Sequence, residues 1–508
     1  MTIDPDQINK ALPASKAELI SVDEPQHSTE LHAAAKKMDY SRFLSAEAVE
    51  RYPSPLKILA LKYLGLPGMI NFGGGLPHPS TFPVNSLTLS FPYLQKNLIV
   101  PGYNPAQSSS STPRPDEYAV DAIAKQDELH VDLTNALQYG QSCGSLQLIK
   151  FLKEHVQRES NIPYEDWDLI ITTGNTDGMD NVLRNIANRG DNIIVEEFAY
   201  PGTVASMGPQ GLNPVVIPLD DEGMIPSILD EVLSTWDESK RGRKPKVLTA
   251  VVTGQNPTGS TMGVKRRQDI YKLAQKHDLL ILLDDPYRAL QIHYPDIHGP
   301  TPPKRIPTFL SMDVDGRVID LSSFSKIVAP GCRCGWLVGP APLIQRLALR
   351  NEVTIQGVSG FSVAAITSFL AALGGQEGWE TYLTSVAATY SRRANLMNSA
   401  FEKHLPKDFV HFTPPTGGMF FYIHINAEKH PRLAELGPEG VLEDVFQSCI
   451  KSRIVTAPSV LFKSDVAVPS RADNISLRCS FSFVNETEVG EGARRLAEGI
   501  TNSFNASA

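Results

Sequence analysis

The chain has 508 residues, of which 42% are hydrophobic and 20% charged, and its formal net charge is −9. This length and apolar content suffice for a large buried core or for several domains. The acidic balance argues against a nucleic acid or an anionic membrane surface as the main partner, so any anionic ligand has to be bound by local arginines.

The first part of the chain shows little regular periodicity. Residues 1–40 are polar, as is typical of a mobile arm, and they hold no apolar stretch of the kind found in a secretory signal. Residues 41–75 are expected to contribute to a smaller domain. Residues 92–132 include AQSSSSTPRPDE, whose serine and proline content predicts a surface insertion.

The middle of the chain alternates between short apolar runs and helical stretches. The apolar runs lie at 169–172, 192–197, 247–252, 279–284, 318–323 and 335–339. Near-continuous apolar strands that alternate with helices indicate a mostly parallel sheet covered on both faces. We therefore predict an α/β fold in which residues 76–350 form a large domain around a sheet of the seven-stranded type.

The last part of the chain, residues 351–508, combines long helical stretches with the apolar runs GGMFFYIHI and NISLRCSF. This pattern predicts a smaller α+β domain. Its most apolar stretch, residues 361–375, is too short to span a bilayer and is expected to be a core helix.

Five cysteines lie at scattered positions, which suggests no disulfide framework. Cys332 and Cys334 form a pair without the further ligands that zinc needs, so we expect no metal site. Together with the absent signal, this favours a cytoplasmic protein that does not bind a membrane.

Polar residues follow five of the predicted strands. In an open α/β sheet, ligands bind at the carboxyl ends of the strands. The first of these ends continues as Gly174, Asn175 and Thr176 into a helix, and such a helix start binds anions through its free N–H groups. The other four ends carry Tyr200; Asn256; Asp284 with Tyr287; and Lys326 with Ser323, Ser325 and Arg333.

Each of these residues also has an ordinary structural interpretation. Taken singly, Asn256 is a common turn former, Asp284 a solvated charge and Tyr200 a core aromatic, while a lone lysine is nearly always on the surface. Their convergence on one edge of a sheet favours a shared binding site instead.

Pyridoxal 5'-phosphate (PLP) is a cofactor that needs these groups together. It requires a lysine for a Schiff base, a carboxylate on its pyridine nitrogen, donors to its phenolate oxygen, an aromatic ring against its own ring, and an arginine with hydroxyls on its phosphate. We therefore predict that Lys326 forms the Schiff base, while Arg333 and Ser323 hold the phosphate.

The motifs QNPTG (255–259), DDPY (284–287) and SFSK with Arg333 resemble the signature of class I/II aminotransferases, which are fold-type I PLP enzymes. RYPSPLK, FGGGLPHPSTFP (72–83), ALQYGQSCG (136–144) and PPTGGMFF resemble in particular the kynurenine/2-aminoadipate aminotransferases and the fungal aromatic amino acid aminotransferases. The resemblance covers nearly the whole chain.

The resemblance implies a role for each position of these motifs. Lys326, Asp284 and Tyr200 are expected to be catalytic, with Asp284 on the pyridinium nitrogen and Tyr200 stacked on the ring. Asn256 and Tyr287 are expected at the phenolate oxygen. The phosphate ligands implied by the resemblance are Ser323, Ser325, Arg333, and Asn175 with Thr176, where the family commonly has a serine–glutamine type pair.

Three further residues take roles from the resemblance. Tyr139 matches a tyrosine that reaches the phosphate bound by the neighbouring subunit, which implies a homodimer. Arg478 matches the arginine that holds the substrate α-carboxylate, where Asn256 is also expected, and Arg51 matches an arginine near the distal end of the substrate. The family usually has an aromatic residue at the position of Arg288, and the resemblance gives this arginine no role.

The function implied is transfer of an amino group from an aromatic amino acid (Phe, Tyr or Trp) to a 2-oxo acid such as 2-oxoglutarate. A kynurenine/2-aminoadipate aminotransferase is the alternative, and a β-lyase, an aminocyclopropane-type synthase or a decarboxylase would use the same cofactor groups. A ligand-sensing transcriptional regulator is disfavoured because no basic recognition helix precedes the motifs. A non-catalytic binding protein is disfavoured by the complete lysine, aspartate and arginine set.

Overall fold

The structure is a computed structural model that describes residues 38–63, 66–70, 72–73, 75–84, 86–89, 132–465 and 475–505. The segments expected as an N-terminal arm (1–40) and as a surface insertion (92–132) lie almost entirely outside the described residues.

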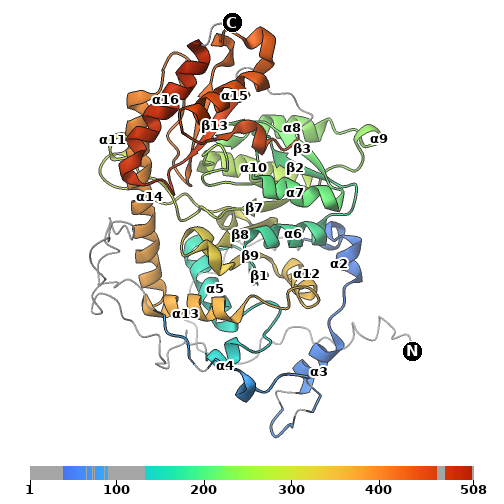
Figure 1. The fold of residues 1–508 in the computed structure, drawn as a ribbon. Helices are drawn as coiled ribbons and strands as arrows, with labels where there is room; N and C mark the ends of the chain where they lie inside the picture. The colour runs from blue at the N-terminus through green and yellow to red at the C-terminus, as the bar shows by residue number, and fades with distance from the viewer. Residues whose placement is uncertain are drawn as a thin grey trace, which may run out of the picture. The chain divides into compact units, whose positions relative to one another are not determined.

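A seven-stranded sheet carries the middle of the chain, in the order β1-β9-β8-β7-β6-β2-β3 (Figure 1). Its strands are β1 (Trp167–Thr172), β2 (Asn192–Glu196), β3 (Asn213–Ile217), β6 (Val247–Ala250), β7 (Leu280–Asp284), β8 (Val318–Ser323) and β9 (Gly335–Pro340). Only β9 runs antiparallel to its neighbours within this sheet. Residues 324–334 are too few for the crossover that a parallel neighbour of β8 requires.

The predicted mostly parallel α/β fold is thus confirmed, and all six predicted apolar runs are strands. β3 was not predicted, because its apolar run is short and begins next to Pro214. Proline is tolerated in a sheet at its edge, where β3 lies.

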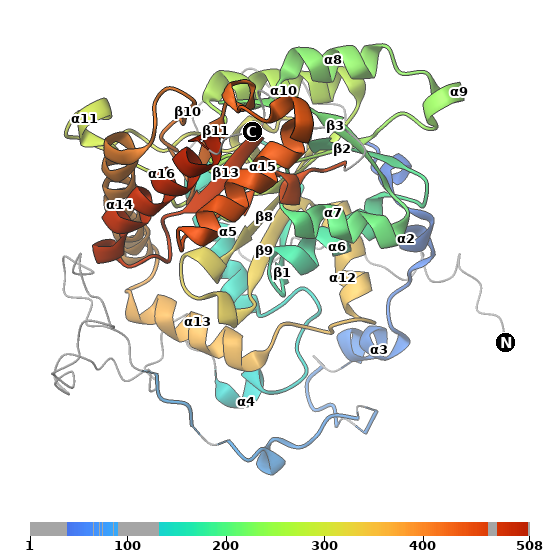
Figure 2. The same ribbon diagram turned by 45° about the horizontal axis from the view of Figure 1, so that its top comes forward.

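Helices pack on both faces of the sheet (Figures 1 and 2). Ile170 packs in one core with Leu183 of α6, whereas its neighbour Ile171 packs in another with Leu152 of α5, because successive strand residues point to opposite faces. The longer helices of this layer are α5 (Leu146–Ser160), α6 (Asn175–Ile186), α7 (Pro201–Gln210), α8 (Pro226–Ser234), α10 (Val264–His277), α12 (Ala341–Asn351) and α13 (Gly360–Ala372).

Short elements connect these layers. They are α2 (Ala46–Glu50), α3 (Pro55–Tyr63), α4 (Leu133–Ala136), α9 (Glu238–Arg241) and α11 (Pro295–His298), together with a hairpin of β4 (Leu219–Asp220) and β5 (Gly223–Met224). Among the described residues, no helix combines the length and the apolar character that crossing a membrane demands.

A second, four-stranded sheet lies in the C-terminal part, in the order β10-β11-β13-β12, and all its pairs are antiparallel. Its strands are β10 (Val410–His411), β11 (Phe420–Ile425), β12 (Ala457–Pro458) and β13 (Ile475–Ser480), with helices α14 (Gln376–His404), α15 (Leu433–Lys451) and α16 (Val489–Asn505). Phe421 and Leu477 of the sheet share a core with Val445 and Leu496 of the helices.

The long helix α14 contributes to the cores of both sheets. Trp379 and Leu383 pack in the core of the large sheet, whereas Met397 and Phe401 pack in the core of the small one. The change from one core to the other therefore falls within α14, while the expected start of the small domain at residue 351 stays a prediction. Periodicity reveals a buried face but not the core against which that face packs.

The start of the segment 41–75 packs on the large sheet, and the expected contribution of this segment to the small domain stays a prediction. Phe43 lies in the same core as Leu183 of α6, and the Ser45 hydroxyl donates to the carbonyl of Arg184 (2.6 Å) while capping α2. This contact joins the start of the described chain to α6, whose N-terminus lies at the edge of the sheet where β1 ends.

Replacing Phe43, which is 1% exposed, by alanine should lower the free energy of unfolding by about 3–5 kcal/mol, because packing is lost and a cavity remains. Urea unfolding followed by circular dichroism measures the loss. Phe483 is 96% exposed and serves as the matched control, whose replacement should change stability by less than about 0.5 kcal/mol. Equal effects of the two substitutions would contradict this packing.

Candidate active site

The N-terminus of α6 faces the guanidinium of Arg333. Gly174 precedes the helix with φ +93°, and a Cβ there would lie 2.6 Å from Arg333 Nη2, so the position requires glycine. Arg333 donates to the carbonyl of Thr173 (3.2 Å). The free backbone N–H groups of this helix start, together with the guanidinium, are suited to bind an anion. Thr176 lies in the same first helical turn and is exposed.

The segment after β8 places hydroxyls and the lysine beside this anion site. Ser323 caps the 3-10 helix Phe324–Lys326: its hydroxyl accepts from the backbone N–H of Ser325 (3.0 Å) and donates to the Ser325 hydroxyl (2.8 Å). Lys326 ends this turn. A second 3-10 helix, Pro330–Cys332, then leads to Arg333.

Asp284 ends β7, where it pairs in register with Leu321 of β8. Asn175 donates to the Asp284 carboxylate (2.7 Å) and to the carbonyl of Leu321 (3.1 Å). Burial raises the pKa of Asp284 to about 6, although the hydrogen bond from Asn175 opposes this rise. Asn175 therefore positions the carboxylate, a contact that the sequence did not predict.

Lys326 lies half-buried within electrostatic reach of three charged site residues. Burial lowers the pKa of its ammonium, and the positive charges of Arg333 and Arg478 lower it further, whereas the Asp284 carboxylate raises it. A lysine with a lowered pKa has a larger neutral fraction, which is the nucleophilic and basic form.

Arg478 reaches this group from β13 of the small sheet. Its Nη1 donates to the side-chain oxygen of Asn256 (2.8 Å). The guanidinium lies over the rings of Phe420 and Phe462, at 4.4 and 4.7 Å from their centroids. Its buried Nε has no hydrogen-bond partner among the described residues, which leaves a donor for a carboxylate ligand.

Two tyrosines border the same group. Tyr287 is buried with its ring edge-on to Phe420, and burial raises the pKa of its phenol, with Asp284 adding to the rise. Tyr200 is 41% exposed at the start of α7 and packs over Gly202, where a Cβ would lie 2.4 Å from the ring. The phenol of Tyr287 interacts electrostatically with Arg478 and with the phenol of Tyr200.

Comparison with known proteins identifies the family. The chain matches the family Aminotransferase class I and II over residues 109–496. The protein belongs to the class I and II aminotransferases. It is 36% identical to an aromatic amino acid aminotransferase of Schizosaccharomyces pombe, with 93% of this chain and 99% of the relative covered.

Two further proteins show how far the similarity extends. This aminotransferase is 30% identical to the mitochondrial kynurenine/alpha-aminoadipate aminotransferase of Bos taurus, over 92% of this chain and 100% of the relative. The crystal structure of aminotransferase Aro8 from Candida albicans matches with a TM-score of 0.83 at 33% identity, over 92% of this chain and 99% of that chain. The family and fold expected from the motifs are confirmed.

Arg51 and Tyr139 are two predicted site residues whose roles stay predictions. Arg51 pairs with Glu47, and its carbonyl accepts from Arg346 of α12. Tyr139 is 64% exposed. None of the contacts of the described residues joins either side chain to Lys326 or Asp284.

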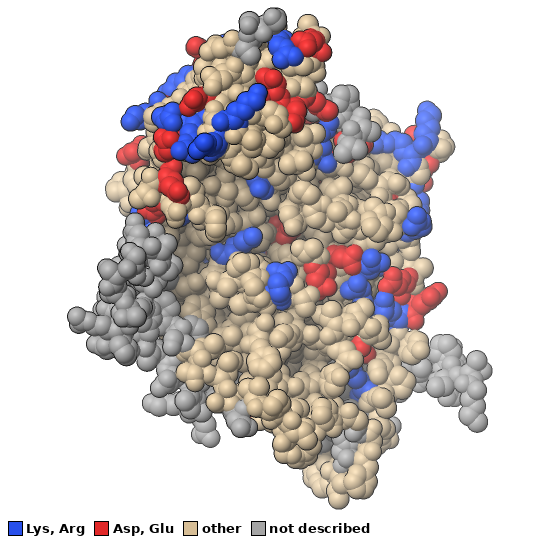
Figure 3. Space-filling model, viewed as in Figure 1, with Lys and Arg blue, Asp and Glu red and all other residues tan. Residues whose placement is uncertain are grey.

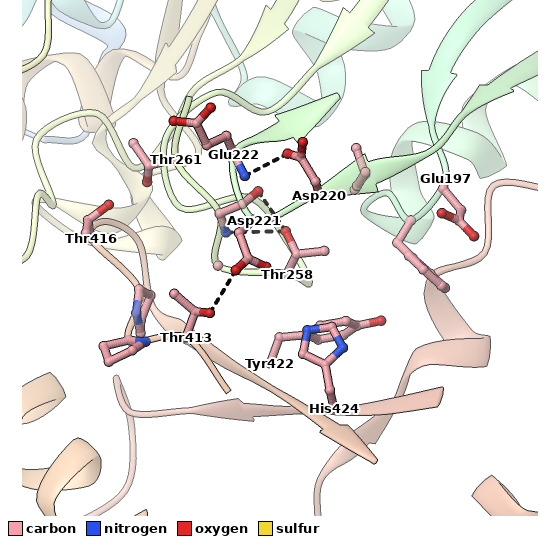
Figure 4. A pocket seen from close by; sticks show the side chains of 16 residues that line it. Glu197, Asp220, Asp221, Glu222, Thr258, Thr261, Thr413, Thr416, Tyr422 and His424 are labelled. Atoms are coloured by element: carbon pink, nitrogen blue, oxygen red, sulfur yellow. Dashed lines mark hydrogen bonds between the residues drawn. The ribbon is translucent and has the colours of Figure 1, made fainter. Parts of the chain in front are cut away.

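A separate hollow of about 290 Å³ shares the turn after β6 with this site (Figure 4). The hollow is lined in part by Asp220, Asp221, Glu222, Thr258, Thr413, Tyr422 and His424. The Thr413 hydroxyl donates to Asp221 (3.0 Å), which links the β4–β5 hairpin to the segment that leads into β11. Neither Lys326 nor Arg478 lines this hollow, so it is not the candidate active site.

Replacing Asp284 by asparagine should make the cofactor-free protein more stable relative to wild type as the pH rises. The unfolded carboxyl ionises near pH 3.8 and the folded one near 6, so the wild type loses up to about 3 kcal/mol across this interval, and the asparagine variant does not. Urea unfolding at pH 4, 5, 6 and 7 measures the difference. Parallel profiles would show that burial does not disfavour this carboxylate.

Proposed function

We propose that this aminotransferase transfers the amino group of an aromatic amino acid (phenylalanine, tyrosine or tryptophan) to a 2-oxo acid such as 2-oxoglutarate, with PLP as its cofactor. The observation that carries the proposal is the position of Lys326, a half-buried amine of lowered pKa within reach of Asp284, Arg333 and Arg478. A lysine beside one carboxylate and two arginines matches a ligand that carries an aldehyde, a phosphate and a basic nitrogen.

The residues present fit PLP. Arg333 would hold the phosphate together with the Ser323 and Ser325 hydroxyls. Its guanidinium lies against Gly174 at the N-terminus of α6. The remaining cofactor ligands in this proposal are Asn175, Thr176, Tyr200, Asn256, Asp284 and Tyr287. When bound, PLP supplies an electron sink for the bonds at the substrate Cα.

The chain's own residues supply binding and proton transfer. Arg478 would bind the substrate α-carboxylate through its unpaired donors, while Asn256 fixes the orientation of the guanidinium. The Lys326 Nζ, once neutral, would take the proton from the substrate Cα as a general base. Holding the Cα near this amine replaces a bimolecular step by an intramolecular one.

The aromatic donor is supported by the similarity to the relative from S. pombe, which is named as an aromatic amino acid aminotransferase. Kynurenine or 2-aminoadipate is the second candidate donor, favoured by the B. taurus relative.

Replacing Lys326 by alanine should abolish turnover with every donor, a loss on the order of a thousandfold or more, because the nucleophile and the general base are removed together. Oxo-acid formation from phenylalanine, tyrosine, tryptophan, kynurenine and 2-aminoadipate measures turnover. Lys265, an exposed lysine paired with Asp269, is the matched control, and its replacement by alanine should leave turnover unchanged. Normal activity of the Lys326 variant would refute the assignment, and release of ammonia or CO₂ in the absence of any oxo-acid acceptor would favour a lyase or a decarboxylase.

We propose further that the protein is a homodimer in which Tyr139 serves the site of the partner subunit. Its side chain is 64% exposed, so it is accessible to a partner subunit. Large apolar side chains on the N-terminal part of the chain are also exposed, namely Leu56, Leu59, Tyr63, Leu66, Ile70, Phe72 and Leu76. Figure 3 shows few charged side chains on the surface over α4 and α13. An apolar surface of this kind is typical of a subunit interface.

Mixing two inactive variants tests this arrangement. A dimer of one Lys326→Ala subunit and one Tyr139→Ala subunit contains a site with an intact Lys326 and, if Tyr139 acts across the interface, an intact tyrosine. We expect activity to return when the two are co-refolded or co-expressed, and light scattering should give about twice 55.6 kDa. No recovery, with a dimeric mass, would place Tyr139 in its own subunit's site.

A further inference from the structure

Arg288 is a buried guanidinium that contacts three carboxylates. It is 9% exposed. Its Nε donates to Asp285 Oδ2 (3.3 Å), its Nη1 to Glu159 Oε2 (3.3 Å) and its Nη2 to Asp320 Oδ2. These partners come from the loop after β7, from α5 and from β8, so one side chain joins three elements.

Two of these elements carry the candidate active site. Asp285 follows Asp284 directly, and its backbone N–H donates to the carbonyl of Leu321 on β8 (3.0 Å). Asp320 lies on the same strand, which leads through Ser323 to Lys326. A small cavity of about 20 Å³ is lined by Arg288 together with Ser322, Ser323 and Ile327, so the arginine lies directly behind the turn that bears the lysine.

The charges of this cluster are not fully balanced. A second buried guanidinium, that of Arg267, donates to the Thr253 hydroxyl (3.3 Å), which itself donates to Asp285 (3.2 Å). Two guanidinium groups thus face three carboxylates. Asp285 Oδ1 and Asp320 Oδ1 are buried and have no hydrogen-bond partner among the described residues. Removing one partner of such a set leaves a buried charge uncompensated, which is strongly unfavourable.

The charge of Asp285 also acts on the neighbouring Asp284, whose pKa it raises in addition to the effect of burial. Burial likewise raises the pKa of Asp320, and Arg288 opposes that rise. Arg288 therefore offsets the negative charge of Asp285, the residue next to Asp284, and has no ion pair with the Asp284 carboxylate itself among the described contacts.

We propose that Arg288 is a positioning residue for the reaction. It holds Asp285 and Asp320 in place, so that Asp284 and Lys326 keep their relative positions. It also offsets the negative charge of Asp285 that acts on the Asp284 carboxylate. This inference rests on the proposed PLP chemistry of the site.

The first test replaces Arg288 by methionine, which keeps much of the volume and removes the charge. In the cofactor-loaded protein, the pH midpoint of the visible absorption band should rise by roughly half a unit or more, because uncompensated negative charge favours the protonated form of the lysine–cofactor linkage. Arg288→Lys should restore much of the wild-type midpoint. Arg305→Met is the matched control, since Arg305 pairs with Glu380 and touches neither Asp285 nor Asp320, and it should cause no shift.

The second test needs no cofactor. In the variant, the buried Asp285 and Asp320 lose their partner, with Asp284, Glu159, Arg267 and His155 as the other charged or titratable groups around them. Burial already raises the pKa of Asp320, and losing Arg288 removes the charge that opposes this rise, so the stability present at low pH is lost further as the pH rises. We expect urea unfolding to show a steeper loss for Arg288→Met than for wild type between about pH 5 and pH 8.

Asp320→Asn provides the opposite change. It removes one buried carboxylate and leaves Arg288 two partners, so the absorption midpoint should fall, and this variant carries the test if Arg288→Met does not fold. Midpoints equal to wild type in both variants would overturn the proposal. A wild-type protein that never shows a cofactor band would refute the proposed function instead, while the unfolding profiles would still report on Arg288.

Discussion

The hydrogen bond between Asn175 and Asp284 is the contact on which the arrangement of this site depends. Burial disfavours the Asp284 carboxylate, and the amide of Asn175 is the interaction that offsets this cost from the adjacent helix start. The same amide also donates to the β8 carbonyl beside Asp284. One side chain thereby fixes the helix N-terminus, the carboxylate and the strand that leads to Lys326.

The two sheets contribute to the site in different ways. The large sheet brings its groups together because the carboxyl ends of its parallel strands meet at one edge. The small sheet supplies Arg478, whose guanidinium crosses to Asn256 of the large sheet's turn and rests on two aromatic rings. A substrate bound by Arg478 would therefore contact residues of both sheets. Because α14 packs in the cores of both sheets, it helps to fix the position of Arg478 relative to the large sheet.

Much of this arrangement could be predicted from local patterns. Lys326 and Asp284 each end or follow an apolar run, and the rule for open sheets places such positions at one edge. Arg478 could not be found in this way, because it comes from a separate antiparallel sheet, and it entered through the resemblance to known aminotransferases. The Asn175–Asp284 contact joins residues far apart in the chain, and no periodicity encodes it. The buried partners of Arg288 were missed for the same reason, although the charged Asp320 inside the apolar run VIDLSS was a local sign of an internal ion pair.

The proposed chemistry is a transaminating half-reaction carried out by Lys326 and its neighbours. The most direct measurement is the absorption spectrum of the PLP-loaded protein titrated with phenylalanine in the absence of any oxo acid. We expect the visible band to disappear with formation of one equivalent of oxo acid per site. A band that never appears, or one that no amino acid discharges, would contradict the claim.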